Sequence, residues 1–221
     1  MIISVEGNIG SGKSTLIDHL KGFIESINLT NYISVYPEDV DNWKKEGWLE
    51  QYYSDMKRFG FGWQTRVLMS ISQLFKTDKY PKKITNIIER NAETAHQVFI
   101  KDMVNNNILT PLEANTLRQL TDMLIDWMPD IVIYIDTNPA LCLDRISIRN
   151  RTGEDGISIE LLESLHENHQ HYIQNMRSRG IKVHIIDGSQ TPELILANCI
   201  QILCLHCNHA FEKCSKLAKG E

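Results

Sequence analysis

The segment whose residue types most clearly indicate chemistry is a glycine-rich loop near the start of the chain. It follows the pattern Gly7-x4-Gly12-Lys13-Ser14. Glycines let a backbone wrap a phosphate with its N–H groups, a lysine at this position reaches the β- and γ-phosphates, and a serine hydroxyl suits the Mg²⁺ ion that bridges them. The pattern therefore predicts binding of a nucleoside triphosphate such as ATP, together with Mg²⁺. The residues that we expect to hold the triphosphate are Gly7, Asn8, Ile9, Gly10, Ser11, Gly12, Lys13, Ser14 and Thr15.

Such a loop needs a strand before it and a helix after it, and the sequence indicates both. Residues 2–5 form a short β-rich run, and apolar residues at helical spacing occupy 13–26. Further short apolar runs, separated by helical patterns, lie at 33–36, 84–88, 131–135 and 183–186. Strands that alternate with helices predict a parallel sheet covered on both faces, so we expect an α/β fold with five strands.

Several helix starts are marked by local chemistry. Thr110-Pro111-Leu112-Glu113 predicts an N-cap, a proline in the first turn and a capping-box glutamate. Asn138-Pro139 and Thr191-Pro192 repeat the pairing of a cap residue with a proline. The polar stretch 76–83 predicts an exposed connection.

The composition limits the classes of partner. The 221 residues include 28 acidic and 23 basic side chains, for a net charge of −5, and this balance favours neither nucleic acid nor a membrane surface as a partner. No apolar run approaches the roughly 20 residues of a spanning helix, and we find no signal or transit peptide, so we expect a cytoplasmic protein. Five cysteines, an odd number, favour reduced thiols. The length suits one domain, 1–221.

Four further segments carry charged, aromatic and amide side chains in a characteristic order: Pro37 to Trp43, Tyr53 to Gln64, Ile87 to Asn91 and Asp144 to Glu154. Together with the loop they resemble the deoxyribonucleoside kinases, the family of deoxycytidine, deoxyguanosine and mitochondrial thymidine kinases and the insect multisubstrate kinase. The resemblance runs from about residue 2 to 187. It implies a P-loop kinase fold, a homodimer, and transfer of the γ-phosphate of ATP to the 5′-hydroxyl of a deoxynucleoside in nucleotide salvage.

The resemblance assigns catalytic roles to residues that follow two strands. Glu38 corresponds to the base for the 5′-hydroxyl, and Trp43 lies beside the base pocket. Glu89 is expected near Mg²⁺, and Arg90 against the 5′-oxygen and the transferring phosphoryl group. A carboxylate at the carboxyl end of a strand lies where ligands gather in open α/β sheets. This chain departs from the family pattern because Asp39 replaces a proline and Asn91 a serine.

The second segment resembles the family's sugar and base segment. Tyr53 would bond the sugar 3′-hydroxyl, and Gln64 would pair with the base through its amide. An amide places a donor beside an acceptor, so one glutamine can serve thymine or cytosine by flipping.

The fourth segment resembles an arginine-rich lid over the donor phosphates, at about 145–155. Arg145 and Arg149 lie one helical turn apart and Arg151 follows, so the three guanidinium groups could stabilise charge as it moves. Glu154 matches the lid carboxylate that joins the tyrosine at the 3′-hydroxyl. Gly153 replaces a second glutamate that many relatives have.

Two positions tune the base in the family. The deoxycytidine and deoxyguanosine kinases have an arginine and an aspartate there, and in this chain the positions fall on Ile71 and Ala95. An uncharged pocket leaves room for the thymine methyl group, so the resemblance favours thymidine and deoxycytidine. Phe99 occupies the stacking position, although one phenylalanine on a helix could equally be core.

Other interpretations stay open on sequence alone. Glu38 and Gln64 could be surface residues, the pair Glu89 and Arg90 a structural ion pair, and the arginines a solvated helix end. A nucleoside monophosphate kinase such as thymidylate kinase also combines a phosphate loop with an arginine lid. A non-catalytic nucleotide-dependent switch is a further alternative, although the guanine-reading Asn-Lys-x-Asp pattern is absent.

The end of the chain, 192–221, is predicted to be a helical tail. Cys204, His206, Cys207 and His209 look like a fragment of a metal site, but a second ligand pair at zinc-site spacing is missing. We therefore expect these side chains to pair without a metal.

Overall fold

The computed structural model describes residues 1–74, 85–151, 154 and 156–207. Its centre is a five-stranded parallel sheet in the order β2-β3-β1-β4-β5. The strands are β1 (Ile2–Gly7), β2 (Ile33–Tyr36), β3 (Thr85–Glu89), β4 (Ile131–Asp136) and β5 (Lys182–Asp187). The predicted α/β fold is confirmed, and every strand overlaps its predicted run. Strands β1, β3 and β4 are almost wholly buried, and β4 accordingly has a nearly continuous apolar sequence.

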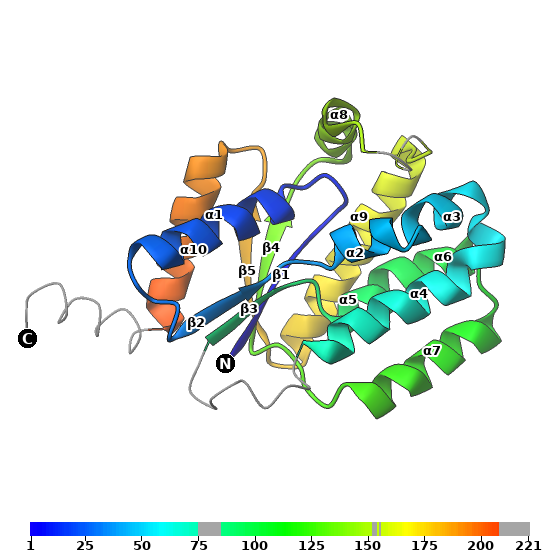
Figure 1. Cartoon of the computed structure of the whole chain (residues 1–221), viewed down its shortest axis with the longest axis horizontal. Coiled ribbons are helices and arrows are strands. Elements are labelled where there is room, and N and C mark those ends of the chain that lie inside the picture. The colour runs from blue at the N-terminus through cyan, green and yellow to red at the C-terminus, as the bar shows by residue number, and fades with distance from the viewer. Residues whose placement is uncertain (75–84, 152–153, 155, 208–221) are drawn as a thin grey trace, which may run out of the picture.

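Helices cover both faces of the sheet (Figure 1). They are α1 (Lys13–Ser26), α2 (Val40–Lys45), α3 (Trp48–Ser54), α4 (Met56–Gln73), α5 (Ala92–Thr94), the π-helix η1 (Ala95–Ile100), α6 (Lys101–Asn105), α7 (Pro111–Leu124), α8 (Pro139–Arg149), α9 (Ile159–Ser178) and α10 (Pro192–His206).

Two buried apolar layers join the helices to the sheet. On one face, α1 and α10 pack on the strands through side chains such as Leu20 and Leu203. On the other face, α9 and η1 pack against β4, with Tyr134 and Tyr172 fully buried between them. Helices α4 and α7 pack outside η1 and enlarge that side of the molecule (Figure 1).

The predicted helix starts are confirmed. The Oγ1 of Thr110 accepts a hydrogen bond from Glu113 N at 3.2 Å, and the Glu113 carboxylate accepts one from Thr110 N at 2.8 Å. This reciprocal pair satisfies two backbone donors at the start of α7. Asn138 caps α8 and Thr191 caps α10.

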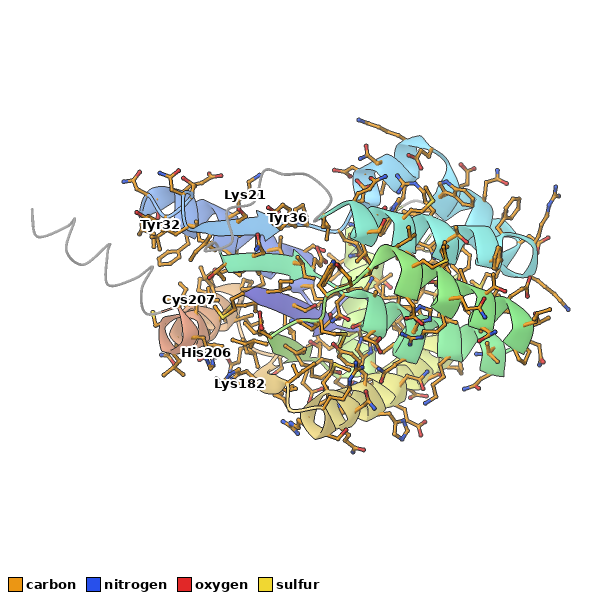
Figure 2. All side chains as sticks on the ribbon, turned by 90° about the horizontal axis from the view of Figure 1, so that it is seen from below. Lys21, Tyr32, Tyr36, Lys182, His206 and Cys207 are labelled. Atoms are coloured by element: carbon orange, nitrogen blue, oxygen red, sulfur yellow. The ribbon has the colours of Figure 1, made fainter. Side chains whose placement is uncertain are left out.

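Helix α10 accounts for the first half of the predicted tail, whereas residues 208–221 lie outside the described part, as does the predicted connection 76–83. The imidazole Nε2 atoms of His206 on α10 and His184 on β5 lie 2.9 Å apart. His206, Cys207 and Lys182 lie at the same end of the molecule, away from α4 and α7 (Figure 2). Among the described residues, no group of three acidic, histidine or cysteine side chains could hold a metal ion. None of the described helices is long and apolar enough to cross a bilayer.

Candidate active site

The residues predicted to do chemistry gather at the carboxyl edge of the sheet. Strand β1 leads into the phosphate loop, β2 is followed by Glu38, and β3 ends at Glu89 and Arg90. Because the three strands are parallel neighbours, their carboxyl ends meet at one edge. The sheet thereby brings together residues that are more than 80 positions apart in the sequence.

The phosphate loop depends on glycine where the backbone is tightest. Gly10 has a φ of 77°, and a Cβ there would lie 2.5 Å from the carbonyl oxygen of Cys142 on α8. Gly12 has a φ of 103° and precedes α1, whose first turn receives no hydrogen bond from a capping side chain. The positive end of this helix dipole therefore faces the loop and favours an anion.

Lys13, the first residue of α1, directly follows Gly12 of this loop and is only 5% exposed. Its Nζ donates a hydrogen bond to the carbonyl oxygen of Asn8 at 2.7 Å. The pKa of Lys13 is lowered to about 8, first by burial and then by the positive charge of Arg90. A triphosphate would restore the charge on this amine, because its oxygens would replace lost solvation.

A chain of polar contacts links the loop to the acceptor side. The Ser14 hydroxyl donates to Glu89 Oε1 at 2.8 Å, and the backbone N–H of Glu38 donates to Glu89 Oε2 at 3.3 Å. The Glu38 carboxylate accepts from Arg90 Nη1 at 2.9 and 3.1 Å. The Arg90 guanidinium also lies 4.6 Å from the ring centre of Phe99. The predicted general base Glu38, Arg90 and the proposed Mg²⁺ ligands therefore form one contiguous group.

The part of the site that is predicted to hold the nucleobase is enclosed by apolar and aromatic side chains. The Trp43 indole packs edge-on to Trp63, with ring centres 5.1 Å apart, and donates its Nε1–H to Ser70 Oγ at 2.9 Å. Gln64 is 3% exposed and donates from Nε2 to the sulfur of Met103 at 3.2 Å. Its Oε1 is buried and has no hydrogen-bond partner among the described residues.

The predicted lid residues form their own ion pairs. Arg149 Nη2 lies 2.5 Å from Glu154 Oε2, and Arg151 Nη1 lies 3.2 Å from Glu154 Oε1. Arg145 instead donates to the carbonyl oxygens of Ser11 and Gly188, at 3.2 and 2.9 Å. Residues 152, 153 and 155, and with them Gly153, lie outside the described part of the chain.

Tyr53 and Glu154, the predicted sugar ligands, line the same cavity. Burial raises the pKa of the Tyr53 hydroxyl, and the charges of Tyr52 and Glu154 raise it further.

One cavity of about 530 Å³ connects the loop, the acceptor side and the base end. Of the predicted residues, it is lined by Ile9, Gly10, Gly12, Lys13, Ser14, Thr15, Glu38, Trp43, Tyr53, Gln64, Ile71, Glu89, Arg90, Ala95, Phe99, Arg145, Arg149, Arg151 and Glu154. Gly7, Asn8 and Ser11 form the body of the loop behind this lining. Asn8, for example, donates from its amide to the carbonyl oxygen of Leu162 at 2.7 Å.

Sequence reasoning missed three polar residues at this site. Glu6 is fully buried on β1 behind the loop, and Asp102 lines the cavity while accepting a hydrogen bond from Ser164. Arg66 on α4 binds Glu46 through Nε at 2.7 Å and Asp39 through Nη2 at 3.2 Å. The one signal in the sequence was Glu6, a charged residue inside an apolar strand. The other two depend on contacts between distant segments.

A comparison with family models supplies the decisive observation about function. The model of the family described as deoxynucleoside kinase matches residues 3–201 of this chain. The chain belongs to the deoxynucleoside kinase family. It is therefore a kinase that acts on deoxynucleosides with an ATP-type phosphate donor. Membership of this family sets aside thymidylate kinase and the nucleotide switch as alternatives.

Relatives within the family carry different substrate names. The chain is 29% identical over 203 residues to the deoxyadenosine kinase of Dictyostelium discoideum, covering 88% of this chain and 78% of that protein. It is 28% identical over 209 residues to the thymidine kinase of Ictalurid herpesvirus 1, covering 92% and 86%. A solved deoxyadenosine kinase structure from M. mycoides, with dCMP and dCDP bound, has a TM-score of 0.77 at 22% identity and covers 92% of this chain and 98% of its own. That likeness shows the shared fold, and the preferred base must be argued from the pocket.

Proposed function

We propose that this kinase transfers the γ-phosphate of ATP to the 5′-hydroxyl of thymidine and deoxycytidine, for nucleotide salvage. The observation that carries recognition of a base is the unpartnered Oε1 of Gln64 in a buried pocket. A base with a donor beside an acceptor would satisfy this oxygen and would give the amide Nε2 a better acceptor than the Met103 sulfur. The N3–O4 edge of thymine and, after a flip of the amide, the N3–N4 edge of cytosine have this pattern.

The shape of the pocket supports a pyrimidine. Ile71 and Ala95 line the cavity without adding a charge, and they are 7% and 4% exposed. Trp43 and Phe99 bring aromatic rings to the same end, where a flat base can stack. Tyr53 beside the sugar leaves little space for a 2′-hydroxyl, so ribonucleosides should be poorer substrates.

The chemistry follows from the contacts around Glu38. Its carboxylate is positioned to take the proton of the 5′-hydroxyl as that oxygen attacks the γ-phosphorus of the donor. Arg90, which binds this carboxylate in the free enzyme, is placed to stabilise the charge on the transferring phosphoryl group. Lys13 and the three lid arginines add positive charge on the donor side.

The oxygens of Ser14 and Glu89 fit a Mg²⁺ ion. A hydroxyl and a carboxylate are hard donors of the kind that Mg²⁺ prefers, and the two are already in contact at 2.8 Å. When bound with ATP, Mg²⁺ supplies neutralisation of phosphate charge. The chain's own contribution is to hold these two oxygens beside Lys13 and Arg90.

We further propose that 1–221 is one kinase domain, with 145–155 as a lid that closes on the donor. A cytoplasmic location stays a prediction.

An ADP-release assay with the four deoxynucleosides tests the proposal. We expect turnover with thymidine and deoxycytidine, and weaker turnover with deoxyadenosine and deoxyguanosine. In the same assay Glu38→Gln should lower kcat by roughly 10²–10⁴, the usual contribution of a positioned general base. Glu50→Gln on the exposed side of α3 is the matched control and should leave kcat unchanged. A wild-type preference for purines would overturn the pyrimidine assignment, and a Glu38→Gln variant that loses only affinity would make Glu38 a binding residue.

A further inference from the structure

The backbone of Arg90 has a conformation that arginine rarely adopts. Its φ is 64°, in the left-handed region, which is sterically unfavourable for a residue with a Cβ. The residue is mostly buried, and its guanidinium is held between Glu38 and the ring of Phe99. Such a conformation persists only when surrounding contacts impose it. Those contacts should therefore determine where the guanidinium points.

The residue after Arg90 uses both ends of its side-chain amide. Asn91 Oδ1 accepts hydrogen bonds from Glu93 N at 2.8 Å and Thr94 N at 3.2 Å, and so caps α5. Its Nδ2 lies 2.7 Å from Glu6 Oε1 and 2.8 Å from the Tyr172 hydroxyl. A cap needs only an oxygen, so the second end of the amide must be explained separately.

Glu6 accepts two hydrogen bonds from Asn91. Its Oε1 accepts from the Asn91 backbone N–H at 3.0 Å as well as from the amide, and Ser4 donates to the same oxygen. Burial raises the pKa of Glu6 to about 7, against the hydrogen bond from Ser4 and the positive charges of Arg90 and Lys13. Burying a carboxyl group costs free energy, and Glu6 forms no ion pair among the described residues that would offset this cost. The stability of the sheet alone therefore does not account for this residue.

The two anchors lie on consecutive residues of β1. The backbone N–H of Arg90 donates to the carbonyl oxygen of Val5 at 3.1 Å, and that of Asn91 donates to Glu6. Gly7, the first residue of the phosphate loop, follows directly. The turn that carries Arg90 is therefore fixed to the same short piece of backbone that carries the loop.

We propose that Asn91 and Glu6 are positioning residues that hold the left-handed turn at Arg90, so that its guanidinium stays in register with phosphates bound by the loop. This inference rests on the proposed role of Arg90 in phosphoryl transfer. Glu6 is not among the described residues that line the cavity, and Asn91 lines it with its side-chain amide already bound to Glu6, Tyr172 and the first N–H groups of α5. We call the contact between Asn91 and Glu6 the brace. Loss of the brace should reduce the rate of transfer more than the binding of either substrate, because Arg90 acts on charge that develops in the transition state.

A double-mutant cycle tests the brace. Asn91→Asp keeps an oxygen that can cap α5, but it removes the donor and sets a second carboxyl group against Glu6. We expect kcat to fall by about 10- to 100-fold, as for a catalytic group displaced by about 1 Å, while KM for ATP and for the nucleoside changes by less than about threefold. The double variant Asn91→Asp with Glu6→Gln exchanges donor and acceptor across the contact. It should recover at least about tenfold of the lost kcat, which a purely additive pair of substitutions would not.

Thermal unfolding and a capping control separate positioning from stability. Thr110→Ala removes the cap of α7 away from the cavity, and it should lower Tm without lowering kcat. If Asn91→Asp cannot be purified, the double variant alone tests the brace. The proposal requires the double variant to fold and to retain kcat within about tenfold of wild type. Unchanged kcat in Asn91→Asp, or a double variant less active than either single one, would overturn the brace. The ADP-release assay on the wild-type protein tests the proposed function separately. An inactive wild type would contradict the proposed function, but it would not contradict the contact between Asn91 and Glu6.

Discussion

At the scale of single residues, the lowered pKa of Lys13 predicts that ATP binding is coupled to proton uptake. With a pKa of about 8 when folded and 10.5 as its ordinary value, this lysine binds fewer protons in the native than in the unfolded state between these values. Its contribution to the free energy of unfolding therefore rises with pH across that window. Near pH 9 the free kinase carries a mostly neutral Lys13, and bound phosphates should recharge it.

We therefore expect ATP binding to take up close to one proton at about pH 9 and far less at about pH 7. Calorimetric titration in two buffers of different ionisation enthalpy measures this uptake. Lys44→Met, at the exposed end of α2, should leave it unchanged. Binding without proton uptake at the higher pH would show that Lys13 is already charged in the free enzyme.

At the scale of elements, an ion-pair network fastens α2 to α4. Arg66 on α4 binds Glu46, which follows α2, and Asp39, which precedes it, and it donates to Ser70 Oγ, the acceptor of the Trp43 indole. Asp39 stands where the family pattern has a proline. An ion pair here restrains a segment that a proline ring would otherwise stiffen.

Removing this restraint should loosen the base pocket. We expect Arg66→Met to raise KM for the nucleoside by about tenfold, roughly 1.4 kcal/mol, with a smaller change in kcat, because Trp43 would lose its fixed position. Steady-state kinetics on purified protein measures both constants. Lys57→Met, exposed on the same helix, is the control. Equal KM values for the two variants would show that α2 holds its place without Arg66.

The base pocket spans two elements, α4 with Ile71 and η1 with Ala95. The double change Ile71→Arg with Ala95→Asp would introduce the charged pair of the deoxycytidine kinase branch. It should penalise thymidine relative to deoxycytidine by about 10- to 100-fold in kcat/KM, since a charged edge left unpaired by thymine is costly. Each single variant, which leaves one charge without its partner, should lose activity on both. If thymidine remains as good a substrate for the double variant, the two positions do not face the base.

Prediction from sequence succeeded where the signal was local. Helix α1 and the capping box at Thr110 follow from neighbouring residues, and the five strands follow from short apolar runs. The site residues could be grouped because parallel strands end at one edge. The contacts of Arg66 span up to 27 positions, and those of Asn91 reach 85 positions back to Glu6. No periodicity encodes such pairings, because they arise only when distant elements pack together.

At the scale of the whole molecule, we expect a homodimer formed through α4 and α7. Leu112 and Met123 are 75% and 83% exposed, and their spacing of eleven residues places them on one side of α7. Met69 on α4 is 44% exposed. Exposed large apolar side chains on two helices that pack together, as α4 and α7 do, are typical of an interface.

Met123→Glu should therefore convert the dimer to a monomer, as measured by light scattering. Leu194→Glu on α10, which also replaces an exposed apolar residue, should leave the dimer intact. A monomeric wild type, or a dimer that survives Met123→Glu but not Leu194→Glu, would place the interface elsewhere.

The ion pairs of Glu154 bear on the timing of the catalytic cycle. In the free enzyme this carboxylate holds Arg149 and Arg151, so it competes with the donor phosphates for the same guanidinium groups. We expect each arriving ATP to displace it, and each departing ADP to be replaced by it. Part of the attraction for phosphate would thereby be given up on entry, and the same carboxylate would speed the exit of product. We expect the kinase to exchange nucleotides quickly, with a weaker hold on ADP than its cluster of arginines alone would suggest.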